Sequence, residues 1–266
     1  GFGSVAKYVA VSTREASFDV ASMAKTSTKV FILEVMGRPA GWIAAAGGLA
    51  STSDSPLPII ILFPEVIFNR KRFIKKVREK VRKCGYCSIV VSEGVKGANG
   101  KFLSDQGLTD AFGHAQLGGV APVIANIIKN DLGLKYHWGV ADYLQRAARH
   151  IASKVDVDQA YALGESAVKL AMQGHNAVMP TIERISDSPY RWQISSTPLS
   201  RVANVEKKMP KKFISNDGFG ITPSCERYLK PLIKGEAYPP FKDGLPKYVV
   251  LKNKLVAKKI GMDFKL

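Results

Sequence analysis

Short apolar runs rich in β-branched residues alternate with amphipathic stretches along the first third of the chain. Residues 29–35, 58–63 and 87–92 are almost continuously apolar and of strand length, so each predicts a buried strand. The stretches between them, 38–49 and 70–83, predict helices. This order of strands and helices predicts an α/β fold, a three-layer sandwich with a mostly parallel sheet.

The two predicted helices carry recognisable end signals. Pro39 suits the first turn of the 38–49 helix, where the missing N–H costs nothing. Asn69 can cap the 70–83 helix, and Gly85 supplies the turn into the third strand. One apolar stripe of the 70–83 helix, with basic residues around it, is formed by Phe73, Ile74, Val77 and Val81.

The pattern is less regular downstream. Residues 93–109 are polar and Gly-rich, which predicts a loop, and 177–183 predict a further strand. Helices are predicted over 110–128, with an interruption at Gly118 and Gly119, over 142–153 and over 156–173.

Eight prolines punctuate the chain from residue 186 onward. They predict extended segments and short helices wrapped over the main body. We therefore divide the chain into an α/β region, 1–185, and a C-terminal segment, 186–266.

Composition supports a globular protein. The chain has 266 residues, of which 46% are hydrophobic and 23% charged, and this excludes disordered and collagen-like classes. Three cysteines favour a reducing compartment and a cytoplasmic location over a disulfide framework. No apolar run approaches the ~20 residues of a membrane span. The first residues do not resemble a signal peptide, and without an initiator Met we expect the numbering to begin inside a longer protein.

The net charge of +17 raises the question of a nucleic-acid partner. Residues 70–83 carry a net +8 and residues 201–266 a net +9, so the rest of the chain is neutral. The simplest interpretation of these two basic segments is a solvent-exposed helix face and a basic C-terminal tail. The lysines are not interleaved with aromatic residues, and we expect no nucleic-acid partner, although that class stays open as an alternative.

Candidate chemistry lies directly after two predicted strands. Met36, Gly37 and Arg38 follow the first strand, and Glu93 and Gly94 follow the third. Ligands bind beyond the carboxyl ends of parallel strands. Gly beside Arg at a helix start would offer backbone N–H groups and a guanidinium to an anion, while a carboxylate suits sugar hydroxyls. The sequence thus indicates a site for a phosphorylated small molecule, with an ordinary structural turn as the alternative.

Five segments resemble, in order, the motifs of 6-phosphofructokinases. They are 29–38, which contains Met-Gly-Arg, then Ala-Gly-Trp at 40–42, Val-Ser-Glu-Gly at 91–94, Asp-Tyr-Leu-Gln-Arg at 142–146, and the helix entry at 153–158. The first eight residues and the run 202–208 look most like the pyrophosphate-dependent branch.

The resemblance implies the phosphofructokinase fold and a glycolytic reaction. The family transfers a phosphoryl group from ATP or pyrophosphate to the 1-hydroxyl of fructose 6-phosphate, giving fructose 1,6-bisphosphate. Met36, Gly37 and Arg38 match the motif that holds the sugar phosphate, and Arg38 also matches the cation that faces the transferred phosphoryl group. Glu93 matches the carboxylate that accepts sugar hydroxyls. Tyr143 and Arg146 match two ligands of the 6-phosphate.

Three positions depart from the family pattern. Lys29 stands where a family Arg reaches the 6-phosphate of a neighbouring subunit, which implies a homo-oligomer. His137 stands where a second such Arg lies, and Asp142 replaces the usual Gly before Tyr143. The cross-subunit contact and the local backbone are therefore expected to differ from the family pattern.

Two family motifs, Gly-Gly-Asp and Pro-Lys-Thr-Ile-Asp-Asn-Asp, are absent from these residues. The second carries the Asp that acts as general base, and acidic residues of both organise Mg²⁺. We expect a chain truncated at the N-terminus, with no metal ligands of its own and no activity alone. A non-catalytic regulatory paralogue that binds sugar phosphate is the alternative, and the choice between pyrophosphate and ATP, the oligomeric state and allosteric control stay open.

Cys84 and Cys87 form a CxxC pair. Zinc would need a second pair of ligands at suitable spacing, and Cys225 does not supply one. A thioredoxin-like motif opens a helix after a strand, whereas this pair precedes a strand. We therefore expect a buried structural pair.

Overall fold

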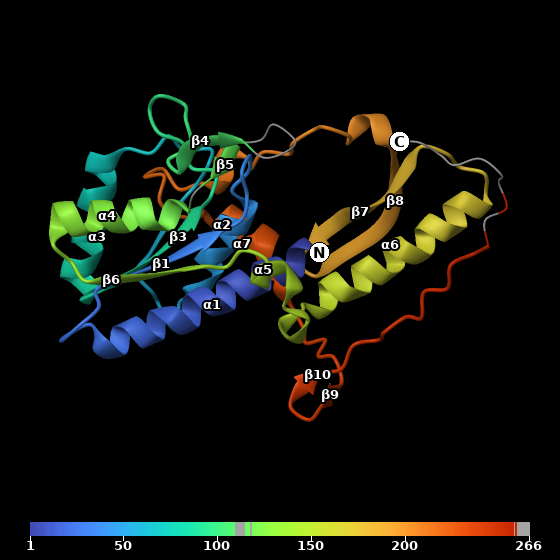
Figure 1. The fold of residues 1–266 in the computed structure, drawn as a ribbon, viewed down its shortest axis with the longest axis horizontal. Coiled ribbons are helices and arrows are strands. Elements are labelled where there is room, and N and C mark those ends of the chain that lie inside the picture. The colour runs from blue at the N-terminus through green and yellow to red at the C-terminus, as the bar shows by residue number, and fades with distance from the viewer. Residues whose placement is uncertain (110–114, 118, 258, 260–266) are drawn as a thin grey trace.

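Four parallel strands form the central sheet (Figure 1). In the order β2-β3-β1-β6 they are β2 (Ile59–Leu62), β3 (Cys87–Ser92), β1 (Val30–Val35) and β6 (Tyr136–Val140). This computed structural model describes residues 1–109, 115–117, 119–257 and 259, and of 105–109 and 115–117 it describes the backbone only. Three of the strands confirm the predicted ones, each within a residue of its predicted ends.

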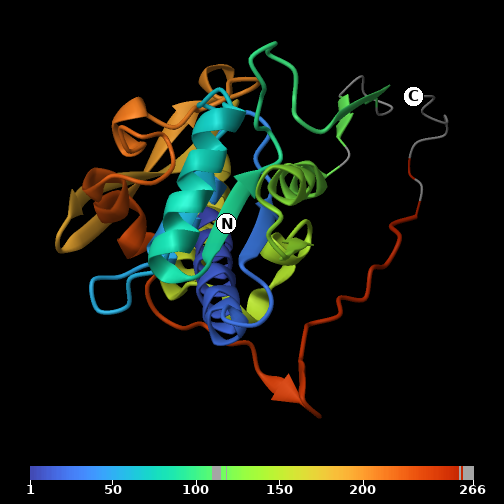
Figure 2. The same cartoon turned by 90° about the vertical axis from the view of Figure 1, so that its left-hand side faces the viewer.

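Helices cover both faces of the sheet (Figures 1 and 2). One face packs against α1 (Phe2–Met23), α2 (Trp42–Ala46) and the 3-10 turn η1 (Gly47–Ala50) through Leu33, Ile61 and Val90. The other packs against α3 (Arg70–Cys84) and α4 (Val120–Leu132) through Ile32, Ile60 and Ile89. Successive strand residues point to opposite faces, so β1, β2 and β3, which are covered on both faces, are apolar almost throughout. The predicted three-layer α/β fold is confirmed.

The first helix, α1, was not predicted from the sequence. Its buried face uses small and polar residues, among them Ala6, Ala10, Thr13 and Ser17. The Ser17 hydroxyl donates to Ser88 Oγ of β3 at 2.7 Å, which satisfies both groups inside the core. A helix that buries small residues has only a weak apolar stripe. The spacing of apolar residues therefore did not predict a helix over these residues.

The helix expected over 38–49 begins later than predicted. It starts at Trp42, with Gly41 as N-cap, and continues as η1. Arg38 and Pro39 consequently lie in the loop between β1 and α2, and the prediction that Arg38 stands at a helix start is wrong. The backbone at Gly37, with φ near 135°, turns the chain away from helical geometry.

Several shorter elements also differ from the predictions. The helix expected over 110–128 is α4 only from Val120 onward, because β5 (Ala115–Leu117) pairs with β4 (Asp105–Thr109) before it. Residues 110–114 and 118, part of that prediction, lie outside the described residues. The helix expected over 142–153 is reduced to α5 (Leu144–Ala147) and the 3-10 turn η2 (Arg149–Ile151). Strand β6 was missed because its side chains are largely exposed, among them Trp138 and Val140, so it lacks the continuous apolar run of a buried strand.

Helix α3 forms as the sequence predicts. The Asn69 side chain accepts a hydrogen bond from the Arg72 N–H at 3.0 Å, and Gly85 ends the helix in a left-handed conformation. The prediction of a buried cysteine pair is wrong, however. Cys84 is exposed at the last turn of α3, whereas Cys87 is fully buried in β3.

Helix α6 (Lys154–Met172) and the hairpin of β7 (Val178–Asp187) and β8 (Tyr190–Pro198) extend beyond the sheet (Figure 1). Helix α6 starts two residues before the predicted 156, with Ser153 as N-cap. Strand β7 passes through residue 185, the expected boundary, and pairs with β8. The division at that boundary stays a prediction.

The C-terminal segment has two parts. The 3-10 turns η3 (Leu199–Arg201), η4 (Lys211–Phe213) and η5 (Lys230–Ile233) and helix α7 (Pro223–Leu229) come first. Within this part Met209, Phe213, Cys225 and Leu229 pack on the α1 face of the sheet, as the expectation of a wrapped segment requires.

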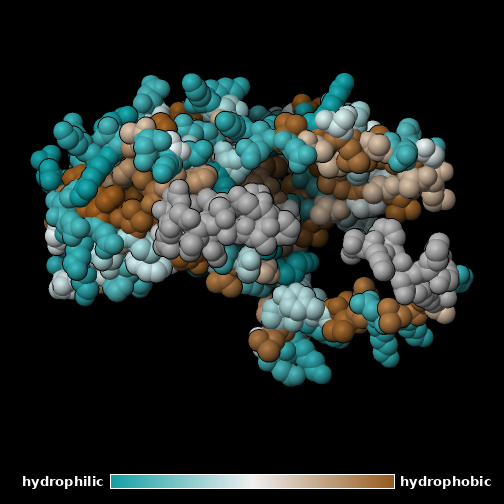
Figure 3. Space-filling view, turned by 45° about the horizontal axis from the view of Figure 1, so that its top comes forward, coloured by the Kyte–Doolittle hydropathy of each residue, from teal (hydrophilic) through white to brown (hydrophobic). Residues whose placement is uncertain are grey.

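Residues 237–257, with β9 (Phe241–Lys242) and β10 (Leu245–Pro246), instead run away from the body (Figures 1 and 3). The wrapping prediction fails for this part, which leaves Phe241, Leu245 and Tyr248 exposed. Among the described helices, none combines the length and apolarity that crossing a bilayer requires.

Candidate functional site at the carboxyl edge of the sheet

The loops after β1 and β3 lie against each other. The two strands pair in parallel up to Val35 and Ser92, so their following loops leave the sheet side by side. The Gly37 N–H donates to Glu93 Oε1 at 3.0 Å, and Ser92 Oγ donates to the Gly37 carbonyl at 2.7 Å. A Cβ on Gly94 would lie 1.9 Å from the Arg38 carbonyl oxygen, so glycine is required there. Sequence-predicted residues of two loops therefore form one locked unit.

The loop that precedes α5 is tied to the same unit by Gln145. Its Oε1 accepts from the Met36 N–H at 3.4 Å, and its Nε2 donates to the Asp142 carbonyl at 2.8 Å. Gln145 is only 2% exposed, so both polar ends are satisfied inside the protein. Asp142 has φ near 35°, in the left-handed region that favours glycine. This explains why the family pattern has glycine at the position.

Tyr143 and Arg146 lie next to each other on this turn. The Arg146 guanidinium carbon is 4.5 Å from the centre of the Tyr143 ring, and both residues are exposed. A guanidinium and a phenol hydroxyl together present several donors, as an incoming phosphate requires.

Glu34 of β1 has a structural role beside the site. It is buried, and its Oε2 accepts from the Ala121 N–H at 2.7 Å in the first turn of α4. Burial raises the pKa of the Glu34 carboxyl, the bond to Ala121 works against this rise, and the nearby charge of Glu93 adds to it. This carboxylate anchors α4 to the sheet.

A second carboxylate, Glu65, anchors the strap, which we define as residues 206–209. Glu65 accepts from the Gly41 N–H at 2.9 Å and from the Met209 N–H at 3.0 Å. The Trp42 indole N–H also donates to the Lys207 carbonyl at 2.8 Å. The strap is therefore fixed to the start of α2, directly beside the Arg38 loop.

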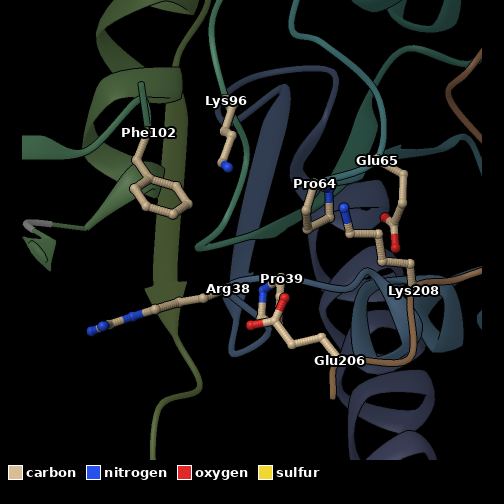
Figure 4. Close-up of a pocket in the computed structure, with 8 residues that line it drawn as sticks. All are labelled: Arg38, Pro39, Pro64, Glu65, Lys96, Phe102, Glu206 and Lys208. Atoms are coloured by element: carbon tan, nitrogen blue, oxygen red, sulfur yellow. The ribbon is translucent and has the colours of Figure 1, made fainter. Parts of the chain in front are cut away.

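The strap closes one side of a cavity of about 320 Å³, which we call the strap pocket (Figure 4). Its walls are Arg38, Pro39, Pro64, Glu65, Lys96, Phe102, Glu206 and Lys208. Arg38 contributes the stem of its side chain, whereas its guanidinium points away from Glu206 (Figure 4).

Lys29 does not join these residues. It directly precedes β1, while Met36 directly follows it, so the two lie at opposite edges of the sheet. The Lys29 ammonium donates to the Ala24 carbonyl near the end of α1. Within one chain Lys29 is thus removed from Arg38, and its assignment to a neighbouring subunit stays a prediction.

The residues present do not fit a magnesium site. Among the described residues, no cluster of three His, Cys, Asp or Glu side chains is arranged to hold a metal ion. Near Arg38, the carboxylates of Glu34, Glu65 and Glu93 each accept backbone N–H bonds. We derive no step through Mg²⁺ from this chain.

Sequence reasoning missed the residues that hold the site in place. Glu34, Glu65, Ser92 and Gln145 bond backbone groups that are distant in sequence, and no local pattern reveals such partners. Gln145 had the strongest signal, because it lies between Tyr143 and Arg146 inside a recognised motif.

The parallel sheet and the locked loops define an α/β protein with a candidate anion-binding site at the carboxyl edge. The chain belongs to the phosphofructokinase family: the family model described as "Phosphofructokinase" matches residues 1–171. The resemblance stated from the motifs is thereby confirmed.

Similar proteins point to the pyrophosphate-dependent branch. The chain is 66% identical over 264 residues to a protein of Methylococcus capsulatus named pyrophosphate–fructose 6-phosphate 1-phosphotransferase, a match that covers 99% of this chain and 63% of that one. A protein of the same name from Halomonas elongata is 63% identical, over 100% of this chain and 63% of its own length. The chain thus spans about 63% of the length of these curated relatives.

A solved structure extends this likeness to the fold. The crystal structure of a pyrophosphate-dependent phosphofructokinase from Nitrosospira multiformis is similar with a TM-score of 0.90 at 65% identity. The match covers 98% of this chain and 62% of that one.

Proposed function

We propose that this chain binds fructose 6-phosphate for phosphoryl transfer from pyrophosphate to the sugar 1-hydroxyl, which gives fructose 1,6-bisphosphate. The observation that carries the proposal is the locked pair of loops, in which Gly37 and Glu93 meet at the carboxyl edge of the sheet. Gln145 ties Tyr143 and Arg146 to the same unit. The names of the similar proteins support pyrophosphate as donor.

Each side chain then has a role that suits its chemistry. Arg146 supplies charge and Tyr143 a neutral donor for the 6-phosphate. One carboxylate oxygen of Glu93, Oε1, accepts from the Gly37 N–H, and the other oxygen would accept a hydrogen bond from a sugar hydroxyl. Arg38 offsets the negative charge that spreads over the transferred phosphoryl oxygens in the transition state. Because the Met36 and Gly37 N–H groups are already bonded within the protein, these two residues shape the site.

We extend the proposal to the chain's catalytic state. The general base and the Mg²⁺ ligands belong to motifs that do not occur in these residues, so we expect no turnover by this chain alone. A coupled assay for fructose 1,6-bisphosphate, with Mg²⁺ and either pyrophosphate or ATP, tests this. Product formation in proportion to the amount of purified chain would contradict it.

A homo-oligomer in the cytoplasm completes the proposal, with Lys29 reaching the 6-phosphate held by a neighbouring subunit. Sedimentation should detect a dimer or tetramer, and Lys29→Ala should weaken fructose 6-phosphate binding without dissociating it. A monomer that binds the sugar phosphate with full affinity would refute the cross-subunit role.

The site assignment is tested by titrating fructose 6-phosphate into Glu93→Gln. Glutamine keeps an acceptor for the Gly37 N–H but loses the charge that strengthens the bond to a sugar hydroxyl. Bonds to charged groups contribute about 1.5–3 kcal/mol, so we expect affinity to fall roughly tenfold or more. Glu79→Gln, an exposed change on α3, is the matched control. Equal affinity of Glu93→Gln and the parent chain would remove Glu93 from the site.

A further inference from the structure

Four exposed cations of α3 lie on one line along the helix. They follow the spacing i, i+4, i+7 and i+11, which places side chains within about 60° of each other around the helix axis and spreads them over about 16 Å. Helix α3 faces the viewer in Figure 2, where no other segment lies in front of it. We call these residues the basic stripe: Lys71, Lys75, Arg78 and Arg82.

The basic stripe differs from the other cations of the same helix. Lys76 donates to the Asp217 carboxylate at 2.6 Å, and Arg72 donates to the Asp217 carbonyl at 2.9 Å. Arg70 pairs with Asp131 of α4. Among the residues that the structure describes, no member of the basic stripe forms an ion pair with a carboxylate. The stripe therefore does not serve to hold α3 against its neighbours.

Another exposed helix of the chain, α6, neutralises its charges internally. There Lys154 pairs with Asp158 and Lys169 pairs with Glu165, each partner one turn away at 2.7 Å. The basic stripe instead sets like charges one turn apart, an arrangement that destabilises a helix. The one acidic residue of α3, Glu79, lies beside the line of the stripe. Because this arrangement lowers helix stability and makes no ion pair within the described chain, it points to a partner outside the chain.

The chemistry of the surface favours an acidic protein helix over other partners. A second copy of the chain is disfavoured, because each copy carries a net charge of +17. Phe73, Ile74 and Val77 are buried against the sheet, so α3 has no such side chain to insert into lipid or to stack on unpaired bases. The phosphates of a DNA strand wind around the duplex, whereas these cations lie on a straight line. A facing helix has the same rise per residue, so carboxylates at the same spacing meet the cations one to one.

We propose that the basic stripe docks an acidic α-helix of another protein, one that carries Asp or Glu at the spacing i, i+4, i+7 and i+11. Exposed ion pairs of this kind speed association and set the orientation of the partner more than they tighten the complex. The stripe contains no residue assigned to the sugar phosphate, so the inference does not rest on the proposed function.

Fluorescence anisotropy with two synthetic helical peptides tests the inference at low salt. The first peptide has four Glu at the stated spacing in a background of Ala and Gln, and the second has the same composition with its Glu residues spread around the helix. We expect the first to bind more tightly. A stripe variant should weaken its binding about tenfold, as loss of four exposed ion pairs requires. That variant combines Lys71→Gln, Lys75→Gln, Arg78→Gln and Arg82→Gln.

A matched control makes the same charge change on four exposed lysines of the C-terminal segment. It combines Lys242→Gln, Lys247→Gln, Lys252→Gln and Lys254→Gln. This control should bind the first peptide as the parent chain does. Urea unfolding should show the stripe variant to be at least as stable as the parent chain, because like charges have been removed from the helix. A loss of peptide binding would then not reflect a loss of folding.

Four results would overturn the proposal. They are no binding of the first peptide, equal affinity for the two peptides, an equal loss in the stripe variant and the matched control, and tighter binding of a DNA duplex or of phosphatidylserine vesicles than of the first peptide. Fructose 6-phosphate is titrated into the same proteins, and the stripe variant should bind it as the parent chain does. Failure of peptide binding alone refutes the docking surface, whereas loss of sugar-phosphate binding by the parent chain refutes the proposed function.

Discussion

Three carboxylates near the sheet edge show how partners decide the role of a residue. Glu34 and Glu65 hold backbone N–H groups of α4, of α2 and of the strap. Among the described residues, Glu93 holds only the Gly37 N–H, and it lies half-buried beside Arg38. The position of Glu93 after a strand could be predicted from sequence. The roles of Glu34 and Glu65 could not, because they depend on which backbone N–H groups from distant parts of the chain need an acceptor. Those partners become visible only when the chain is folded.

At the residue scale, Asp217 makes a testable contribution to stability. Its partial burial opposes ionisation, but bonds from Lys76 at 2.6 Å and from Ser215 and Phe219 outweigh this and lower its pKa to about 2. A carboxyl whose pKa is depressed in the folded state stabilises the fold above its unfolded pKa, and loses that effect as pH falls toward 2.

Asp217→Asn should therefore lower the free energy of unfolding at pH 7. The residue is about half exposed, so we expect about 1 kcal/mol after allowance for solvent screening. Urea unfolding between pH 2 and 7 should show the difference from the parent chain shrinking toward pH 2. Asp243→Asn, an exposed change in the C-terminal part, should leave stability unchanged. A difference for Asp217→Asn that is constant with pH would contradict the ionic origin.

The three cysteines should differ sharply in reactivity. Burial raises the pKa of Cys87 and of Cys225 to about 12, so both are protonated and shielded, whereas Cys84 is exposed. A thiol reagent should modify one cysteine in the native chain and three after unfolding, and Cys84→Ser should abolish the native reaction. Rapid modification of Cys87 in the folded chain would contradict the structure.

At the scale of elements, a helix or strand could be predicted where its sequence pattern of apolar and polar residues matches its burial in the fold. Strands β1, β2 and β3 and helix α3 could be predicted because continuous apolar runs and a one-sided stripe match their surroundings. Helix α1 buries Ala and Ser, and β6 is half-exposed at the sheet edge, so neither shows such a pattern. The start of α2 was misplaced because Pro39 suits a helix entry, and tertiary contacts of the Arg38 loop decided otherwise.

The cap of α3 gives a prediction at this scale. Asn69→Ala removes the acceptor of the Arg72 N–H and should cost about 1 kcal/mol of stability, as loss of such caps usually does. Asn69→Asp retains an acceptor and should stay close to the parent chain. Denaturant unfolding of the three proteins measures both effects. Equal unfolding midpoints for Asn69→Ala and the parent chain would show that the cap does not contribute to stability.

At the scale of the whole molecule, the placement of charge matters more than its sum. Part of the basic face of α3 binds neighbouring elements, since Arg70 forms two bonds with Asp131 of α4, at 2.6 and 2.8 Å, and Lys76 binds Asp217. The cations assigned to the sugar phosphate, Arg38 and Arg146, lie outside both charged segments. The net charge alone would therefore favour a nucleic-acid partner, whereas position at the end of a strand predicts a site for a phosphorylated small molecule.

The most direct test of the central claim is a calorimetric titration of fructose 6-phosphate into the parent chain, Arg146→Ala and Arg82→Ala. Arg146 is proposed to meet the 6-phosphate, while Arg82 is an exposed residue of α3 that makes the same charge change elsewhere. The proposed site predicts that Arg146→Ala weakens binding about tenfold to a hundredfold, the effect of losing a charge-assisted bond, and that Arg82→Ala does not. Equal affinity of all three proteins for fructose 6-phosphate, or no binding by the parent chain, would contradict the claim that this edge of the sheet is the sugar-phosphate site.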